Sequence, residues 1–130
     1  MAYTVEQMFV KQLQATAGVT TLVGTRIYPQ AAPQGTTADY VTYEFSGNPI
    51  QAHDGSGGLH RGRISFLCHA TTYANAKAAA AAIRVALDGF RGTMQGVSVG
   101  ACLQEMEADA GFDDDTRMHV VAVDFRVLYQ

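Results

Sequence analysis

Residues 60–89 read HRGRISFLCHATTYANAKAAAAAIRVALDG, and two hydrophobic periods meet in this stretch. Over residues 60–70, apolar and polar side chains alternate, which predicts a strand with one buried face. After Thr71 or Thr72, either of which can cap a helix, apolar residues recur at helical spacing until Gly89 ends the pattern. A strand that leads directly into such a helix indicates a domain in which helices pack on a sheet. The expected apolar seam of the helix consists of Tyr73, Ala76, Ala80, Ile83 and Leu87.

One more main helix and three more strands are expected outside this stretch, together with a short helical turn at residues 19–23 before Gly24. The helix is expected from Thr4 to Gly18, and Thr4 with Gln7 has the spacing of a capping box. In the second half of the chain, the alternating residues Val97, Val99, Ala101 and Leu103 mark the apolar face of a strand. The strands are expected at residues 39–45, 97–103 and 119–129. The order α-β-β-α-β-β, with two hairpins and two main helices, predicts an α+β fold whose four-stranded antiparallel sheet carries both helices on one face.

Four connecting segments are expected to lack regular structure. Residues 26–39 contain two prolines, and residues 89–96 are rich in turn residues. The glycine-rich residues 47–58 and the acidic residues 108–116 are expected to form loops that project from the two hairpins.

Composition restricts the class of protein. The 130 residues correspond to one domain, residues 1–130, which can bury a core without disulfide bonds. Charged residues make up 16% of the chain, below the usual quarter, so we expect a partner to cover part of the surface. A net charge of −3 with dispersed basic residues argues against tight nucleic-acid binding. Cys68 and Cys102 lie in apolar runs and are expected to be reduced, as in the cytoplasm, and we find no signal-peptide or membrane-span pattern.

Residues with catalytic potential gather between His53 and His60. Asp54 and Ser56 complete the residue types of a nucleophilic triad, but all of them lie in one glycine-rich loop without a rigid nucleophile turn. His53, Asp54 and His60 could ligate a metal, although their spacing is unlike that of zinc sites. We therefore expect no catalytic residue, no metal site and no cofactor. The alternative is that the protein is an enzyme, namely a small metal- or serine-dependent hydrolase that uses these residues.

Charged residues supply the candidate contact surfaces. The acidic stretch from Glu105 through Glu107 and Asp109 to Asp115 is interpreted as a solvated hairpin tip, with a contact to another subunit as the alternative. Polar side chains, among them Glu44 and Asp124, are expected on the sheet face away from the helices, where opposite charges can pair across strands. The candidate interface residues are Asp54, Ser56, His60, Arg61, Arg63, Asp113, Asp114, Asp115 and Arg126.

Short blocks along nearly the whole chain resemble one family. They are Arg26-Ile27-Tyr28-Pro29, Ala32-Pro33-Gln34-Gly35, Tyr40-Val41-Thr42-Tyr43-Glu44, Ser46-Gly47-Asn48-Pro49, Gly58-Leu59-His60-Arg61-Gly62-Arg63, Cys68-His69-Ala70-Thr71-Thr72-Tyr73, Ala86-Leu87-Asp88-Gly89-Phe90-Arg91-Gly92 and Asp124-Phe125-Arg126-Val127-Leu128-Tyr129. In their order, spacing and total length, these blocks resemble the tail-completion, or tail-terminator, proteins of phages and prophages. The Asp113-Asp114-Asp115 run is not part of the resemblance.

The resemblance implies a structural virion protein without catalytic activity. It implies a homo-oligomeric ring, a hexamer, which caps the head-proximal end of a long tail, stops tube polymerisation and joins the tail to the head connector. The implied partners are other copies of the chain, the tail tube protein and a head–tail connector or stopper protein. Neither a membrane nor specific nucleic-acid binding is implied, although the genome would pass through the ring. The implied location is the neck of the virion, after assembly in the host cytoplasm. A head-side adaptor ring and a monomeric binding module stay open as alternatives.

Overall fold

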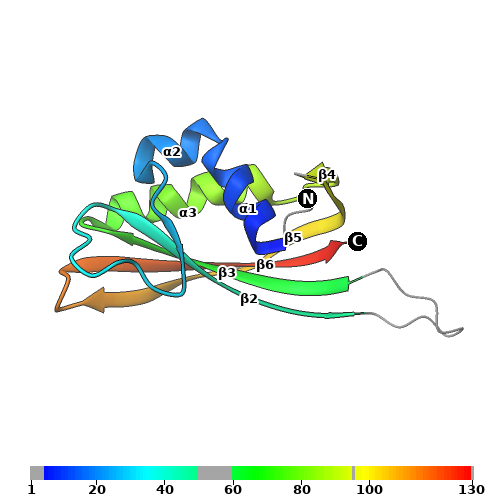
Figure 1. Cartoon of the computed structure of the whole chain (residues 1–130). Helices are drawn as coiled ribbons and strands as arrows, with labels where there is room; N and C mark the ends of the chain where they lie inside the picture. Colours follow the sequence, from blue (N-terminus) through cyan, green and yellow to red (C-terminus); the bar gives the residue numbers. More distant parts are fainter. Residues whose placement is uncertain (1–4, 50–59, 95, 130) are drawn as a thin grey trace, which may run out of the picture.

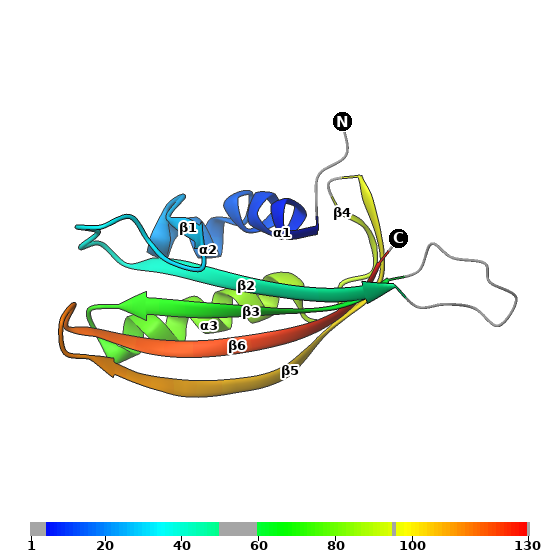
Figure 2. The ribbon, with the colours of Figure 1, turned by 60° about the horizontal axis from the view of Figure 1, so that its bottom comes forward.

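A computed structural model describes residues 5–49, 60–94 and 96–129, and its helices lie on one face of a curled sheet (Figure 1). The described elements are α1 (Val5–Gln14), α2 (Ala17–Val23), β1 (Ile27–Pro29), β2 (Tyr40–Pro49), β3 (His60–Ala70), α3 (Tyr73–Leu87), β4 (Gly92–Met94), β5 (Val97–Asp113) and β6 (Met118–Tyr129). The strand order is β1-β2-β3-β6-β5-β4, so β3 and β6 lie at the centre (Figure 2). None of the described helices combines the length and the apolar character that a bilayer-spanning helix needs.

The antiparallel pairing of β2 with β3 and of β5 with β6 confirms the two predicted hairpins. The four-stranded sheet is wrong, because β1 and β4 add a strand at each edge and the described sheet has six strands. β1 pairs with β2 in parallel, and β4 pairs with β5 antiparallel. Each has three residues, which is too short for an alternating pattern, and both lie in segments predicted to be irregular.

The first helix is shorter than predicted, and the short helical turn expected at residues 19–23 is part of α2. α1 ends at Gln14 rather than at Gly18, and Gly18 lies inside α2. Thr16 separates the two helices with an extended backbone, φ −99° and ψ 112°, and its hydroxyl donates to the Gln12 carbonyl at 2.8 Å. Thr4 of the expected capping box lies outside the described residues.

The core lies between the helices and the sheet and is centred on aromatic rings. Phe66 of β3 is fully buried, and its ring makes edge-on contacts with Phe9 of α1, at 6.3 Å between centroids, and with Phe125 of β6, at 6.1 Å. The alanines of the α3 seam are buried as predicted, since small side chains let the helix approach the sheet closely. Tyr73 is an exception to the predicted seam, because 45% of it is exposed at the end of α3.

Bulges correct the predicted facing of β5. The pairing of β5 with β6 shifts between Val99 and Ala101, again between Gln104 and Met106, and again between Asp109 and Gly111. The first shift places Cys102 in the core and leaves Leu103 46% exposed. The single apolar face that the alternation predicted for Val97 to Leu103 is therefore wrong, because a bulge inserts one residue that an alternating pattern does not count.

The two long loops contain fewer residues than predicted, because the strands beside them are longer. β2 continues through Pro49, and residues 50–58 of the first loop lie outside the described residues. β5 continues to Asp113, so the turn of the second hairpin consists of residues 114–117. Glu105, Glu107 and Asp109 therefore lie within a strand, and their interpretation as a solvated hairpin tip is wrong.

Removing the central ring should weaken the whole fold. We expect Phe66→Ala to lower the free energy of unfolding by about 3–5 kcal/mol, because a buried aromatic residue is replaced by a cavity. Val85→Ala is the matched control, since Val85 is 80% exposed on α3 and should change stability by less than about 0.5 kcal/mol. Urea unfolding followed by circular dichroism measures both, and similar values for the two variants would contradict the described core.

The two threonines before α3 allow a test of its cap. The Thr72 hydroxyl accepts a hydrogen bond from the Asn75 backbone N–H at 3.1 Å, whereas Thr71 bonds through its backbone N–H to Asp39. We expect Thr72→Ala to cost about 1 kcal/mol of stability. Thr71→Ala keeps its backbone bond and should cost much less in the same unfolding measurement, and the reverse order would assign the cap to Thr71.

Candidate assembly interface

The sheet face away from the helices carries a cluster of charges. Arg63 of β3 and Arg126 of β6 are direct cross-strand neighbours, which by itself is repulsive. Arg63 Nη2 lies 3.0 Å from Asp124 Oδ2 and 3.8 Å from Glu105 Oε2, and Arg126 Nε lies 3.4 Å from Glu105 Oε1. The two carboxylates offset the repulsion between the guanidinium groups. Because the arginines are half exposed, these pairs contribute little to stability and leave the charges available to a partner.

An apolar hollow adjoins this charge cluster. Its volume is about 190 Å³, and it is lined by Arg61, Ala101, Leu103, Arg126 and Leu128. We call this site the arginine hollow. Leu103 is 46% exposed, and Met106, on the same strand, is 50% exposed. Among the described residues, Arg61 forms no ion pair. A polar rim around exposed apolar side chains is typical of a surface that contacts another protein.

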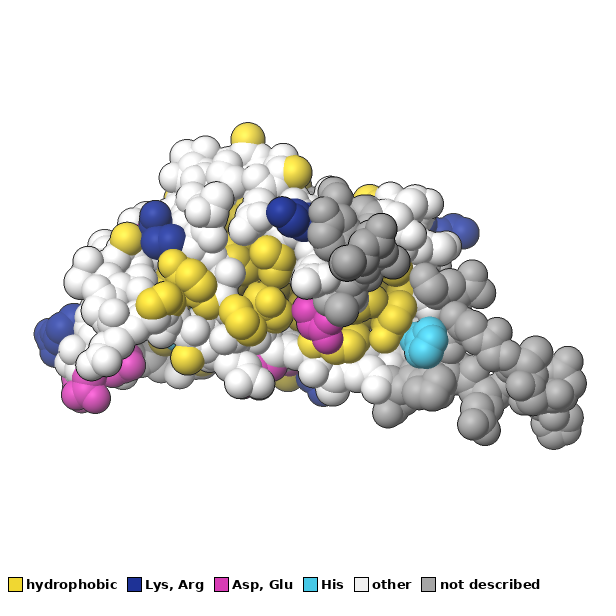
Figure 3. All heavy atoms as spheres, in the orientation of Figure 1, with side chains coloured by type: hydrophobic (Ala, Val, Ile, Leu, Met, Phe, Trp, Pro, Cys, Tyr) yellow, Lys and Arg dark blue, Asp and Glu magenta, His cyan; other side chains and the backbone are white. Residues whose placement is uncertain are grey.

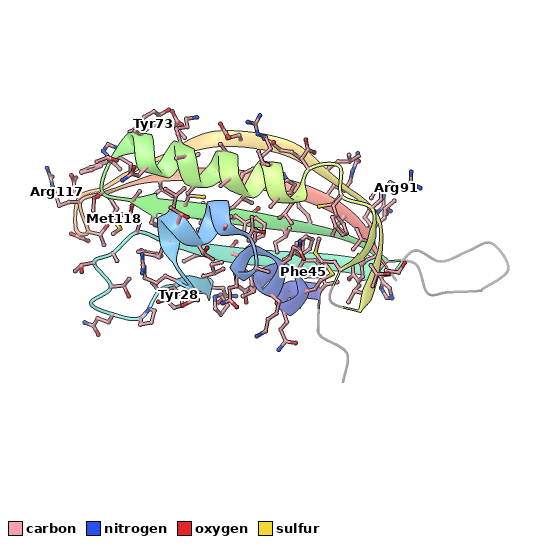
Figure 4. All side chains as sticks on the ribbon, turned by 90° about the horizontal axis from the view of Figure 1, so that it is seen from above. Tyr28, Phe45, Tyr73, Arg91, Arg117 and Met118 are labelled. Atoms are coloured by element: carbon pink, nitrogen blue, oxygen red, sulfur yellow. The ribbon has the colours of Figure 1, made fainter. Side chains whose placement is uncertain are left out.

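Three of the aspartates predicted at the interface, Asp113, Asp114 and Asp115, lie at the other end of the sheet. Asp113 pairs with Met118 at the start of β6, whereas Arg61 pairs with Leu128 near its end. These ten residues of strand correspond to about 33 Å, so the candidate residues form two separate patches. Figure 4 shows Arg117 and Met118 at the same end of the molecule as Tyr73, with Arg91 at the opposite end.

The turn at that end, residues 113–117, has a defined conformation, and we call it the acidic turn. Asp113 Oδ1 accepts from the backbone N–H of Asp115 at 2.9 Å, and the Asp113 carbonyl accepts from the Arg117 N–H at 2.7 Å. Arg117 has a φ of 60° and lies 3.6 Å from Asp114, whose side chain is 89% exposed. The turn therefore holds its aspartates outward in a fixed arrangement.

The remaining acidic residues of β5 bind α3. Lys77 Nζ lies 3.1 Å from Glu107 and 3.2 Å from Asp109, and the Tyr73 hydroxyl donates to Asp109 at 3.0 Å. The hydrogen bond to Glu107, followed by the one to Asp109, raises the pKa of Lys77 above its ordinary value. The Tyr73 hydroxyl, and then Lys77, lower the pKa of Asp109. Sequence reasoning missed this network, although Lys77 among alanines opposite an acidic strand was a signal for it.

The sheet is open along part of its other edge. The Val41 N–H donates to the Arg26 carbonyl and the Gln30 N–H donates to the Tyr43 carbonyl, both at 2.9 Å, and β1 then ends. Beyond Tyr43, the described part of β2 has no neighbour on this side. A groove of about 300 Å³ follows this edge, and Figure 3 shows hydrophobic side chains gathered between the helices and the sheet. The groove is lined by Glu6, Gln7, Pro29, Gln30, Tyr43, Glu44 and Phe45.

The histidines among the described residues do not converge on a site. His53, Asp54 and Ser56 lie outside the described residues, and His60 stacks on Tyr129 at 5.2 Å between ring centroids. His69 lies on the open face, where its ring nitrogen is 3.1 Å from the Thr42 hydroxyl, and burial lowers its pKa. Within residues 5–49, 60–94 and 96–129, we find no group of three metal-ligating side chains.

Both cysteines are free thiols in the core. Cys68 and Cys102 have no exposed surface, and burial raises the pKa of each thiol to about 12. A thiol reacts through its thiolate, so neither cysteine has the properties of a nucleophile at neutral pH.

Thiol titration tests this burial. We expect a thiol-specific chromogenic reagent at pH 8 to modify neither cysteine in the native protein and to modify both in denaturant. The cause is the pKa of about 12, which leaves few thiolates at pH 8, together with the lack of access. Rapid modification of one thiol without unfolding would show that the core is open near that residue.

Comparisons with known proteins match the chain to a family and to a chain of a solved virion structure. Residues 7–130 match the family described as tail completion protein gp17. Five chains of solved structures match, and one comes from the structure described as the virion of a native gene transfer agent (GTA) particle. That chain is 28% identical, with a TM-score of 0.74, and the alignment covers 96% of the present chain and 93% of the virion chain. None of the curated proteins matches.

Proposed function

The chain belongs to the tail completion protein gp17 family, and on that premise we propose that it forms a ring at the head-proximal end of a phage-like tail. Its role in tail completion is structural. The observation that carries this assignment is the family match over residues 7–130, and the similarity to a chain of a GTA virion supports it. In the proposed ring, residues 1–130 act as one domain that stops growth of the tail tube and joins the tail to the head connector.

The surface of the chain supports a ring of identical subunits. A closed ring requires two different patches on each subunit, each meeting the other patch on a neighbouring copy. The arginine hollow and the acidic turn are two such patches, and they lie far apart on the same sheet. We propose six copies per ring, with the tail tube protein on one side, a connector or stopper protein on the other, and the virion neck as the location.

The proposed role does not require an active site. Within the described residues, the two thiols are buried and no group of side chains that could bind a metal is present. Several charged side chains form ion pairs from strand to strand, as Arg63 and Arg126 do with Glu105, or from strand to helix, as Glu107 does with Lys77. We therefore propose that the protein acts through contacts with other proteins rather than by turnover of a substrate.

Particle assembly without the chain tests this function. We expect electron microscopy of particles made without it to show tails of uncontrolled length that are not joined to heads. Supplying the wild-type chain, or the Val85→Ala control, should restore normal tails. Tails of normal length that fail to join heads would instead indicate a head-side adaptor, and fully assembled infectious or transducing particles would contradict both roles.

A further inference from the structure

We propose that the arginine hollow of one subunit binds the acidic turn of a second copy of this chain. This inference rests on the proposed ring and identifies the two surfaces that would meet in it. The receiving site is the hollow lined by Arg61, Ala101, Leu103, Arg126 and Leu128. The segment that binds there is the turn from Asp113 to Arg117 of the neighbouring subunit.

The hollow exists because of bulges in β5. Without the shift between Val99 and Ala101, Leu103 would face the core, as the alternating pattern predicts. The second shift, after Gln104, accompanies Met106 on the open face, where it is 50% exposed. Bulges interrupt strand pairing and are often found where a strand must redirect a side chain. In this strand they direct two large apolar side chains toward solvent, which is favourable once a partner covers them.

The charges of the two surfaces are complementary. The charged residues around the hollow are three arginines and two acidic residues: Arg61, Arg63, Arg126, Glu105 and Asp124. The three positive and two negative charges leave an excess of one positive charge. Arg61 carries this excess, because it forms no ion pair with a described residue. Opposite charges on two surfaces favour their encounter and fix their register.

The acidic turn carries the opposite excess. The turn contains three aspartates, Asp113 to Asp115, and one arginine, Arg117, so it has an excess of two negative charges. The Asp113 side chain accepts hydrogen bonds from the backbone N–H groups of Asp115 and Thr116, which fix the turn, so little conformational entropy is lost when it binds. Beside the turn, Phe112 is 42% exposed and supplies an apolar side chain for the hollow.

The two surfaces of one molecule cannot meet each other. They are separated by ten residues of β6, about 33 Å of strand, within a sheet whose central pairs are in continuous register. The turn can therefore reach a hollow only on another copy. Such a contact joins two different patches, which is the type of interface that builds a ring when the rotation closes.

Exchange of one charge on each surface tests the pairing. Arg61→Glu changes the hollow and Asp115→Arg changes the turn, and neither side chain has an ion-pair partner among the described residues. We expect each variant alone to self-associate at least about tenfold more weakly than wild type, because like charges then face each other. An equimolar mixture of the two, or the double variant, should regain association to within about threefold. Sedimentation equilibrium up to millimolar concentration measures all of these.

Arg84→Glu is the matched control, since it makes the same charge change on an exposed position of α3. It should associate as wild type does, and thermal unfolding should show that every variant is folded. The proposal is overturned if the single variants associate as strongly as wild type, if the mixture is no stronger than its components, or if wild type stays monomeric. The particle assay distinguishes failure of this pairing from failure of the proposed function. If each single variant gives normal tails but tails made without the chain are aberrant, the pairing is rejected and the proposed function is kept.

Discussion

The pairing of β3 with β6 is the interaction on which the other features depend. The two strands run through eleven consecutive residue pairs from His60–Tyr129 to Ala70–His119 without a bulge. Because side chains alternate between the faces of a sheet, this register places Phe66 and Phe125 under the helices and Arg63 and Arg126 on the open face. A slip by one residue would exchange the faces, burying arginines and exposing phenylalanines. The core therefore fixes the position of the charged surface as firmly as it fixes the fold.

Sequence periodicity predicted the elements that are long and regular. β3, β6 and the buried positions of α3 follow their hydrophobic patterns, because each packs one face against a single core. β1 and β4 could not be found in this way, since three residues held in place by a neighbouring strand carry no period of their own. The facing of Leu103 depends on a pairing shift relative to β6, and no local pattern records it.

The candidate interface was also predicted only where local periodicity determines the position of a side chain. Arg61, Arg63 and Arg126 were predicted on one face, and the strand register brings them together. Asp113 to Asp115 were assigned to the interface as well, but their distance from the arginines follows from the length of β5, which was underestimated by ten residues (predicted end 103, observed end 113). The other acidic residues of β5 lie on two different faces of the sheet. Glu105 pairs with the arginines of the open face, whereas Glu107 and Asp109 pair with Lys77 of α3. One acidic run thus serves both the surface and the attachment of α3.

The two edges of the sheet differ in how readily another strand can add to them. Three bulges and several acidic side chains interrupt the long edge of β5, and such irregularities discourage pairing with foreign strands. β2 beyond Tyr43 shows no bulge against β3 in the described residues, and a groove lined by both polar and apolar side chains runs beside it. Uncontrolled strand addition to the free subunit would therefore begin at β2. Crowding, slow purification and long storage would promote aggregation first at the edge of β2. A proline or lysine introduced at that edge is the substitution that would best keep the unassembled protein soluble.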